Sequence, residues 1–261
     1  MPRFAANLSL MYPEHALLDR VAAAASDGFA AVEVQAPYAV PAAELRAALA
    51  DARVQLVLMN APQGDDEAGE RGLAALPGRE RDFEAAVAQA LDYARVVGAP
   101  RVHVLAGIPG VLPAAECERV YRRNLAHACD VFAPHGIEVM IEPINTRDMP
   151  GYFLHCLQHA VRTIEAVARP NLRLQFDCYH VQIMEGDLTR RLREHFSLIG
   201  HVQIAGVPQR HEPDLGEVHY PFIFAQLDAL GYRGWVGCEY RPAAGSRPGG
   251  TRMGLSWLRR L

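Results

Sequence analysis

The sequence contains no lysine, and all 26 basic residues of the 261-residue chain are arginines. Schiff-base aldolases, pyridoxal-phosphate enzymes and P-loop nucleotidases each depend on a lysine amine. The absence of lysine therefore excludes these three classes of protein.

Cysteine pairs and long apolar runs are also missing. The five cysteines include no C-x-x-C pair, and an odd number of scattered cysteines does not form a disulfide framework. No apolar run approaches the roughly 18 residues of a membrane span, and the N-terminus lacks the apolar core of a signal peptide. We therefore expect a soluble protein of the reducing cytoplasm with no membrane partner.

An excess of positive charge is absent as well. The 26 basic and 30 acidic residues give a formal net charge of −4. Such a chain has no general attraction for nucleic acid, so we expect no nucleic-acid partner. An anionic ligand must instead be bound by a few local arginines.

The chain has the length and composition of one α/β domain. Its hydrophobic content of 50% is sufficient for a continuous core. No stretch before residue 241 has the composition of a linker, and the Gly- and Pro-rich residues 241–250 come too late to divide the chain. We expect a single domain over residues 1–261, with a mobile last loop at about 241–250.

Eight short apolar runs recur through the chain and alternate with stretches of helical periodicity. Their spacing of roughly thirty residues matches the length of a strand, a crossover helix and the next strand. This pattern predicts a (β/α)8 TIM barrel, with a doubly wound open sheet as the alternative. The expected strands are residues 4–10, 31–35, 55–60, 101–106, 138–142, 172–177, 201–205 and 235–239.

Polar residues stand at the C-terminal ends of these runs, where a TIM barrel builds its active site. Glu142, Asp177, Gln203 and Glu239 supply the oxygen ligands that a hard divalent cation prefers. We expect them to hold one metal ion, Mg²⁺ or Mn²⁺, with Zn²⁺ or Co²⁺ as alternatives. A solvated carboxylate is the ordinary role for one such residue, but four at regular spacing favour a site.

Other residues near strand ends are candidates for binding a substrate. His180, three residues after Asp177, can donate a hydrogen bond to a substrate oxygen, and Arg210 can clamp a carboxylate. Either histidine, His180 or His103, could instead be structural, and loop arginines are commonly only solvated. The complete set of substrate-binding candidates is His180, Arg210, His103, Asn60 and Arg71.

Several motifs resemble the hydroxypyruvate isomerase family, a branch of the xylose-isomerase-like barrels, over nearly the whole chain. They are RFAANLS (3–9), AGERG (68–72), PGR (77–79), IEPIN (141–145), MPG (149–151), HVQIA (201–205) and GWVGCEY (234–240). The resemblance implies a barrel that interconverts the 2-oxo acid hydroxypyruvate and 2-hydroxy-3-oxopropanoate. It also implies that Glu142 and Glu239 are the acid/base pair as well as metal ligands.

The substrate is less well defined than the reaction. Residues 102–108 are more similar to a branch of the same family that isomerises four-carbon 2-oxo-tetronates. The family commonly has tryptophan and alanine where this chain has Asp66 and Glu67, and aromatics where it has Gln35 and Ala36. The oligomeric state is open, and a homo-oligomer is compatible with the sequence.

Two functions of other classes are alternatives. Asp177-x-x-His180 and Glu217-Val-His219 faintly resemble ligand pairs of abasic-site endonucleases, which are metal hydrolases of the same superfamily. Those enzymes bind several zinc ions through many histidines, whereas this chain has Asn60 and Gln203 at candidate positions. A non-catalytic sugar-acid-binding barrel would keep the same metal ligands.

Overall fold

The protein is a closed barrel of eight parallel strands. The computed structural model describes residues 1–65 and 67–260. Each strand pairs with the next, and the first pairs with the last, which closes the sheet. The strands are β1 (Arg3–Asn7), β2 (Ala31–Val34), β3 (Gln55–Asn60), β4 (Arg101–His103), β5 (Glu138–Ile141), β6 (Leu172–Asp177), β7 (Ile199–Ile204) and β8 (Trp235–Cys238). The TIM-barrel prediction is confirmed, and closure excludes the open sheet.

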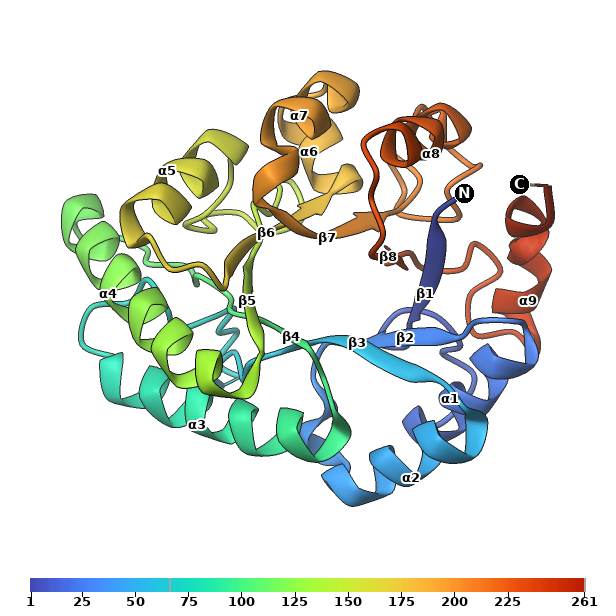
Figure 1. Cartoon of the computed structure of the whole chain (residues 1–261), viewed down its shortest axis with the longest axis horizontal. Coiled ribbons are helices and arrows are strands. Elements are labelled where there is room, and N and C mark those ends of the chain that lie inside the picture. Colours follow the sequence, from blue (N-terminus) through green and yellow to red (C-terminus); the bar gives the residue numbers. More distant parts are fainter. Residues whose placement is uncertain (66, 261) are drawn as a thin grey trace.

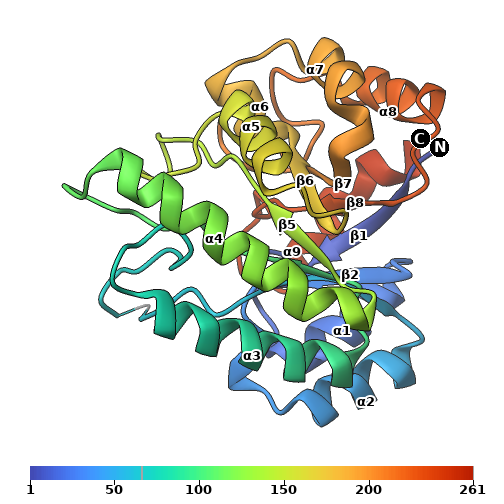
Figure 2. The ribbon, with the colours of Figure 1, turned by 60° about the vertical axis from the view of Figure 1, so that its left-hand side comes forward.

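The helices surround the barrel on its outside (Figure 1). Figure 2 shows α3 and α4 side by side across one flank, where the two helices are in contact. The α-helices in the described part of the chain are α1 (Leu17–Ser26), α2 (Ala42–Ala52), α3 (Glu80–Val97), α4 (Ala114–Phe132), α5 (Leu157–Val167), α6 (Cys178–Met184), α7 (Leu188–His195), α8 (Tyr220–Ala229) and α9 (Gly250–Gly254).

Helix α3 illustrates how the sequence builds this outer layer. Phe83, Val87 and Ala90 recur at helical spacing and are buried, so they form one apolar face against the barrel. Full burial of a side chain such as Phe83 contributes about 1.5–3 kcal/mol. The helix is followed by Gly98 at φ +75°, a left-handed conformation that glycine adopts without steric cost.

Strand β4 is shorter than the sequence predicted and ends at His103 rather than at residue 106. Beyond it, the carbonyl oxygens of Leu105 and Ala106 accept hydrogen bonds from the loop that follows β3. Gly72 of that loop packs so closely that a Cβ would lie 2.5 Å from the Leu105 oxygen. The backbone of Leu105 and Ala106 therefore bonds to this loop and anchors it beside the barrel mouth.

The segment after β8 makes specific backbone contacts. The N–H of Arg241 donates to the carbonyl of Arg210 at 2.7 Å. The buried carboxylate of Glu212 accepts from the N–H of Ala243 at 3.1 Å. The mobility expected for 241–250 stays a prediction. Within residues 1–65 and 67–260, no helix combines the length and apolar character that crossing a membrane requires.

Candidate active site

A cavity of about 620 Å³ opens at the C-terminal ends of the strands. Eight of the nine residues predicted to form the site line it: Asn60, Arg71, His103, Glu142, His180, Gln203, Arg210 and Glu239. The ninth, Asp177, is fully buried and contacts two residues of this group, His180 and Arg210. The structure therefore gathers all nine at one end of the barrel.

The four predicted metal ligands come from four consecutive strands. Asp177 is the last residue of β6 and Gln203 lies near the end of β7, while Glu142 and Glu239 directly follow β5 and β8. Neighbouring parallel strands bring these ends together. All four side chains are buried.

Burial makes this group of acids costly to ionise. Desolvation, reinforced by Glu239 and Asp177, raises the pKa of Glu142 well above its ordinary value. Desolvation raises the pKa of Asp177 to about 6 and that of Glu239 to about 8, although Arg210 opposes both shifts. Nearby positive charge would favour the ionised carboxylates.

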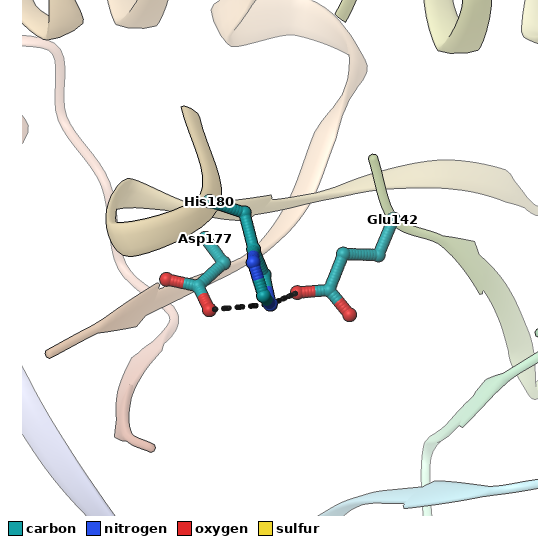
Figure 3. A group of neighbouring side chains, drawn as sticks. All are labelled: Glu142, Asp177 and His180. Atoms are coloured by element: carbon teal, nitrogen blue, oxygen red, sulfur yellow. Dashed lines mark ion pairs between the residues drawn. The ribbon is translucent and has the colours of Figure 1, made fainter. Parts of the chain in front are cut away.

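Among the proposed ligands in the described part of the chain, two buried carboxylate oxygens have no hydrogen-bond partner, Oε1 of Glu142 and Oδ2 of Asp177. Both face Nε2 of His180, at 3.8 Å and 3.6 Å (Figure 3). One ligand atom from each of these three residues lies within 4.8 Å of the others. Orphaned, buried carboxylate oxygens fit a hard divalent cation, because such ions prefer oxygen ligands.

The other two predicted ligands are hydrogen-bonded within the protein. Oε1 of Gln203 accepts from Nε2 of Gln175 at 2.6 Å. Oε1 of Glu239 accepts from Gln35 at 2.9 Å and from the guanidinium of Arg210. These donors hold the two oxygens beside the Glu142 and Asp177 pair.

Arg210 places a fixed positive charge among the acids. Besides Glu239, its guanidinium lies 3.8 Å from Asp177, and it packs over the Tyr179 ring at 4.9 Å. Its own backbone has φ +57°, and its N–H donates to the carbonyl of Gly206 at 2.8 Å. A non-glycine residue in this left-handed conformation is uncommon.

The remaining predicted residues form the walls. His103 is buried with Nδ1 3.7 Å from Glu142, and desolvation lowers its pKa to about 3, so the ring is neutral. Asn60 and the partly buried Arg71 stand at the mouth. Asp66, one of the departures from the family pattern, lies outside the described residues.

Glu33 is a buried residue of the site that the sequence analysis missed. Its carboxylate accepts from Asn7 at 3.1 Å and from Gln203 at 2.8 Å, and it contacts Nε2 of His201. A Cβ on Gly237 would lie 2.0 Å from Oε1 of Glu33, so glycine makes room for the carboxylate. The available signal was a glutamate inside the apolar run AVEV.

The comparisons with known proteins agree with this geometry. The profile of the xylose isomerase-like TIM barrel family matches residues 21–261. This chain belongs to that family. A family relative from Cupriavidus necator, named 2-oxo-tetronate isomerase, is 56% identical over 99% of this chain and 98% of its own length.

Two further members extend the comparison. A protein of Escherichia coli named hydroxypyruvate isomerase is 40% identical over 99% of this chain and 98% of its own length. The crystal structure of a Brucella melitensis protein, described as an AP endonuclease of family 2, has a TM-score of 0.96 and 46% identity. That match covers 100% of this chain and 99% of the other. The curated relatives thus carry isomerase names.

Proposed function

We propose that this protein is a metal-dependent isomerase that moves a carbonyl group between C2 and C3 of a small 2-oxo acid. In the three-carbon case it interconverts hydroxypyruvate and 2-hydroxy-3-oxopropanoate. The observation that carries this proposal is the pair Glu142 and Glu239, two buried carboxyl groups with raised pKa values that line one cavity. The isomerase names of the relatives support the same class of reaction.

Glu142, Asp177, Gln203 and Glu239 would hold the metal, for which Mg²⁺ or Mn²⁺ suits the oxygen donors best and Zn²⁺ or Co²⁺ are alternatives. When bound, the cation supplies Lewis-acid polarisation of the carbonyl and balances the negative charge that develops during the reaction.

The two glutamates divide the proton transfer. One carboxylate takes the proton from C3 as the C3–H bond breaks, and the other carboxyl group gives a proton to C2. The hydroxyl proton moves from the C3 oxygen to the C2 oxygen, so atoms and charge balance. A carboxyl group whose pKa lies near 7 can both give and take a proton at neutral pH. Burial raises the pKa of Glu239 to about 8.

Arg210 and His180 orient the substrate in this scheme. The planar guanidinium of Arg210 can bind the substrate carboxylate through two parallel hydrogen bonds. His180 lies beside Glu142 and Asp177, where it can donate to a substrate oxygen. The enclosing walls of the cavity limit the access of water to the reacting carbons.

A four-carbon 2-oxo-tetronate is the second candidate substrate. The Cupriavidus necator relative at 56% identity favours it, because that protein is named for this substrate. The same proton transfer between C2 and C3 applies, and a cavity of about 620 Å³ accommodates either chain length. Turnover of the two substrates, compared as kcat/KM, decides between them.

Deuterium exchange tests the reaction class. The metal-loaded protein is incubated with hydroxypyruvate, or with a 2-oxo-tetronate, in deuterated buffer, and Glu239→Gln serves as the inactive control. Isomerisation or deuterium incorporation at C2 or C3 is expected. If neither substrate shows isomerisation or deuterium incorporation, the protein is not an isomerase of these acids and the non-catalytic binding barrel is favoured. Cleavage of abasic-site DNA would instead support the endonuclease.

We also propose a cytoplasmic location, with which the five free cysteines are consistent.

A further inference from the structure

The two ring nitrogens of His180 face chemically different surroundings. Nδ1 lies 3.3 Å from the backbone N–H of Asn145 and 2.6 Å from its side-chain Nδ2. Nε2 lies on the opposite side, toward the orphaned oxygens of Asp177 and Glu142. A backbone N–H can only donate, so it requires a lone pair on Nδ1.

The side chain of Asn145 is held in one orientation by Asp148. Oδ1 of Asn145 accepts from the N–H of Asp148 at 2.8 Å, and its Nδ2 donates to the Asp148 carboxylate at 3.2 Å. Rotating the amide by 180° would set oxygen against carboxylate and NH₂ against N–H. Asn145 therefore presents donors, and no acceptor, to Nδ1 of His180.

His180 has only one proton to place between the two nitrogens. Both donors of Asn145 face Nδ1, so this nitrogen carries a lone pair and the ring proton is left to Nε2. One competing contact exists, since Nη2 of Arg210 lies 3.4 Å from Nε2. That contact is long for a hydrogen bond, whereas Asn145 offers two donors, one of them much closer.

We propose that Asn145 is a positioning residue that fixes His180 in the tautomer with hydrogen on Nε2. On the proposed function, this tautomer makes His180 a donor to a substrate oxygen. It also withholds the Nε2 lone pair from the metal, although His180 lies next to two of the ligands. The metal site is then made of oxygen atoms only.

Nitrogen NMR of the wild-type protein tests the tautomer without any assay of turnover. In ¹⁵N-histidine-labelled protein, long-range ¹H–¹⁵N correlations distinguish an Nε2–H ring from an Nδ1–H ring, and the spectrum of His180→Gln assigns the signals. We expect the Nε2–H pattern, both metal-free and with Mg²⁺. An Nδ1–H pattern would overturn the proposal, whether or not the protein is an isomerase.

Two substitutions at Asn145 test the cause. Asn145→Asp puts an acceptor on Nδ1, so the ring should gain an N–H there, and kcat should fall by about 100-fold or more. Asn145→Ala removes the amide but keeps the backbone N–H, so the Nε2–H pattern should persist and the loss should stay below about tenfold. Equal losses, or an unchanged ring pattern in Asn145→Asp, would contradict the positioning role.

The bound metal provides a third readout. With Mn²⁺ in place of Mg²⁺, electron spin-echo spectra report directly coordinated ¹⁵N nuclei. We expect no strong ¹⁵N coupling from His180 in the wild type. A coupling that disappears in His180→Gln would identify the ring as a ligand and refute an all-oxygen site.

Discussion

Glu33 holds the amide of Gln203 in one orientation. Nε2 of Gln203 donates to Oε2 of Glu33 at 2.8 Å, although the two residues are 170 positions apart in the sequence. With its nitrogen committed to Glu33, Gln203 keeps its oxygen available to the other side, where it accepts from Gln175. Held in this orientation, the amide oxygen would serve beside the three carboxylates in the proposed metal site.

Replacing Glu33 by glutamine should therefore weaken metal binding without touching a ligand. A neutral amide offers one acceptor oxygen where the carboxylate offers two, so a donor among Asn7, His201 and Gln203 loses its partner. We expect about 10- to 100-fold weaker Mn²⁺ affinity by calorimetry. Glu118→Gln, on α4 at the outside of the barrel, is the control and should bind Mn²⁺ like the wild type.

The two glutamates of the proposed acid/base pair can be told apart kinetically. Glu142→Gln and Glu239→Gln should each lower kcat by about 10²- to 10⁴-fold, because each loses a proton-transferring group. With substrate deuterated at C3, the variant lacking the base should retain the label, while the variant lacking the acid should still release it slowly. Full turnover by either metal-loaded variant would refute its assignment.

Arg210 should oppose metal binding while it assists substrate binding. Its guanidinium contacts Glu239 and lies 3.8 Å from Asp177, so it neutralises negative charge that would otherwise attract a metal cation. Arg210→Met should bind Mn²⁺ about tenfold more tightly. This gain in binding free energy is only a small part of the repulsion expected between two nearby positive charges. Its KM for the 2-oxo acid should rise. Arg210→Lys, which keeps the charge, should not gain metal affinity; if both variants bind Mn²⁺ like the wild type, the argument fails.

The free energy of unfolding below neutral pH should depend on His103. Burial lowers its folded-state pKa to about 3, whereas an unfolded histidine titrates near 6.5. The unfolded chain thus binds more protons between these values, and the free energy of unfolding falls as pH falls below about 6.5. Between pH 7 and 5, the wild type should lose about 2 kcal/mol more than His103→Gln. Urea unfolding at both pH values measures the difference, and parallel losses would contradict it.

Much of the architecture was predictable from the sequence, because apolar runs and their spacing report local structure. The barrel follows from eight such runs, and the run expected over residues 138–142 correctly placed Glu142 at the C-terminal end of β5. Strand β4 was overestimated, because the backbone of the apolar residues Leu105 and Ala106 bonds to a loop rather than to a strand. Apolarity alone cannot distinguish these two environments.

The supporting residues could not be predicted in the same way. Glu33 and His201 meet from positions 168 residues apart, and their contact depends on strand register and barrel closure. The role of Asn145 depends on which end of an amide faces a histidine ring. Neither relationship produces a periodic pattern of residues that could be recognised in the sequence.

The proposed ligands and much of the cavity wall come from different halves of the barrel. The four proposed ligands come from β5 to β8, whereas much of the surrounding wall comes from β1 to β4 and the loops that follow them, including residues 34–39 and 60–64. Changes in the loop that follows β3, including residues 60–64, can thus reshape the chamber while the proposed ligands stay in place. A barrel of this kind can acquire a new substrate by exchanging loops, and its descendants can share one reaction across acids of different length.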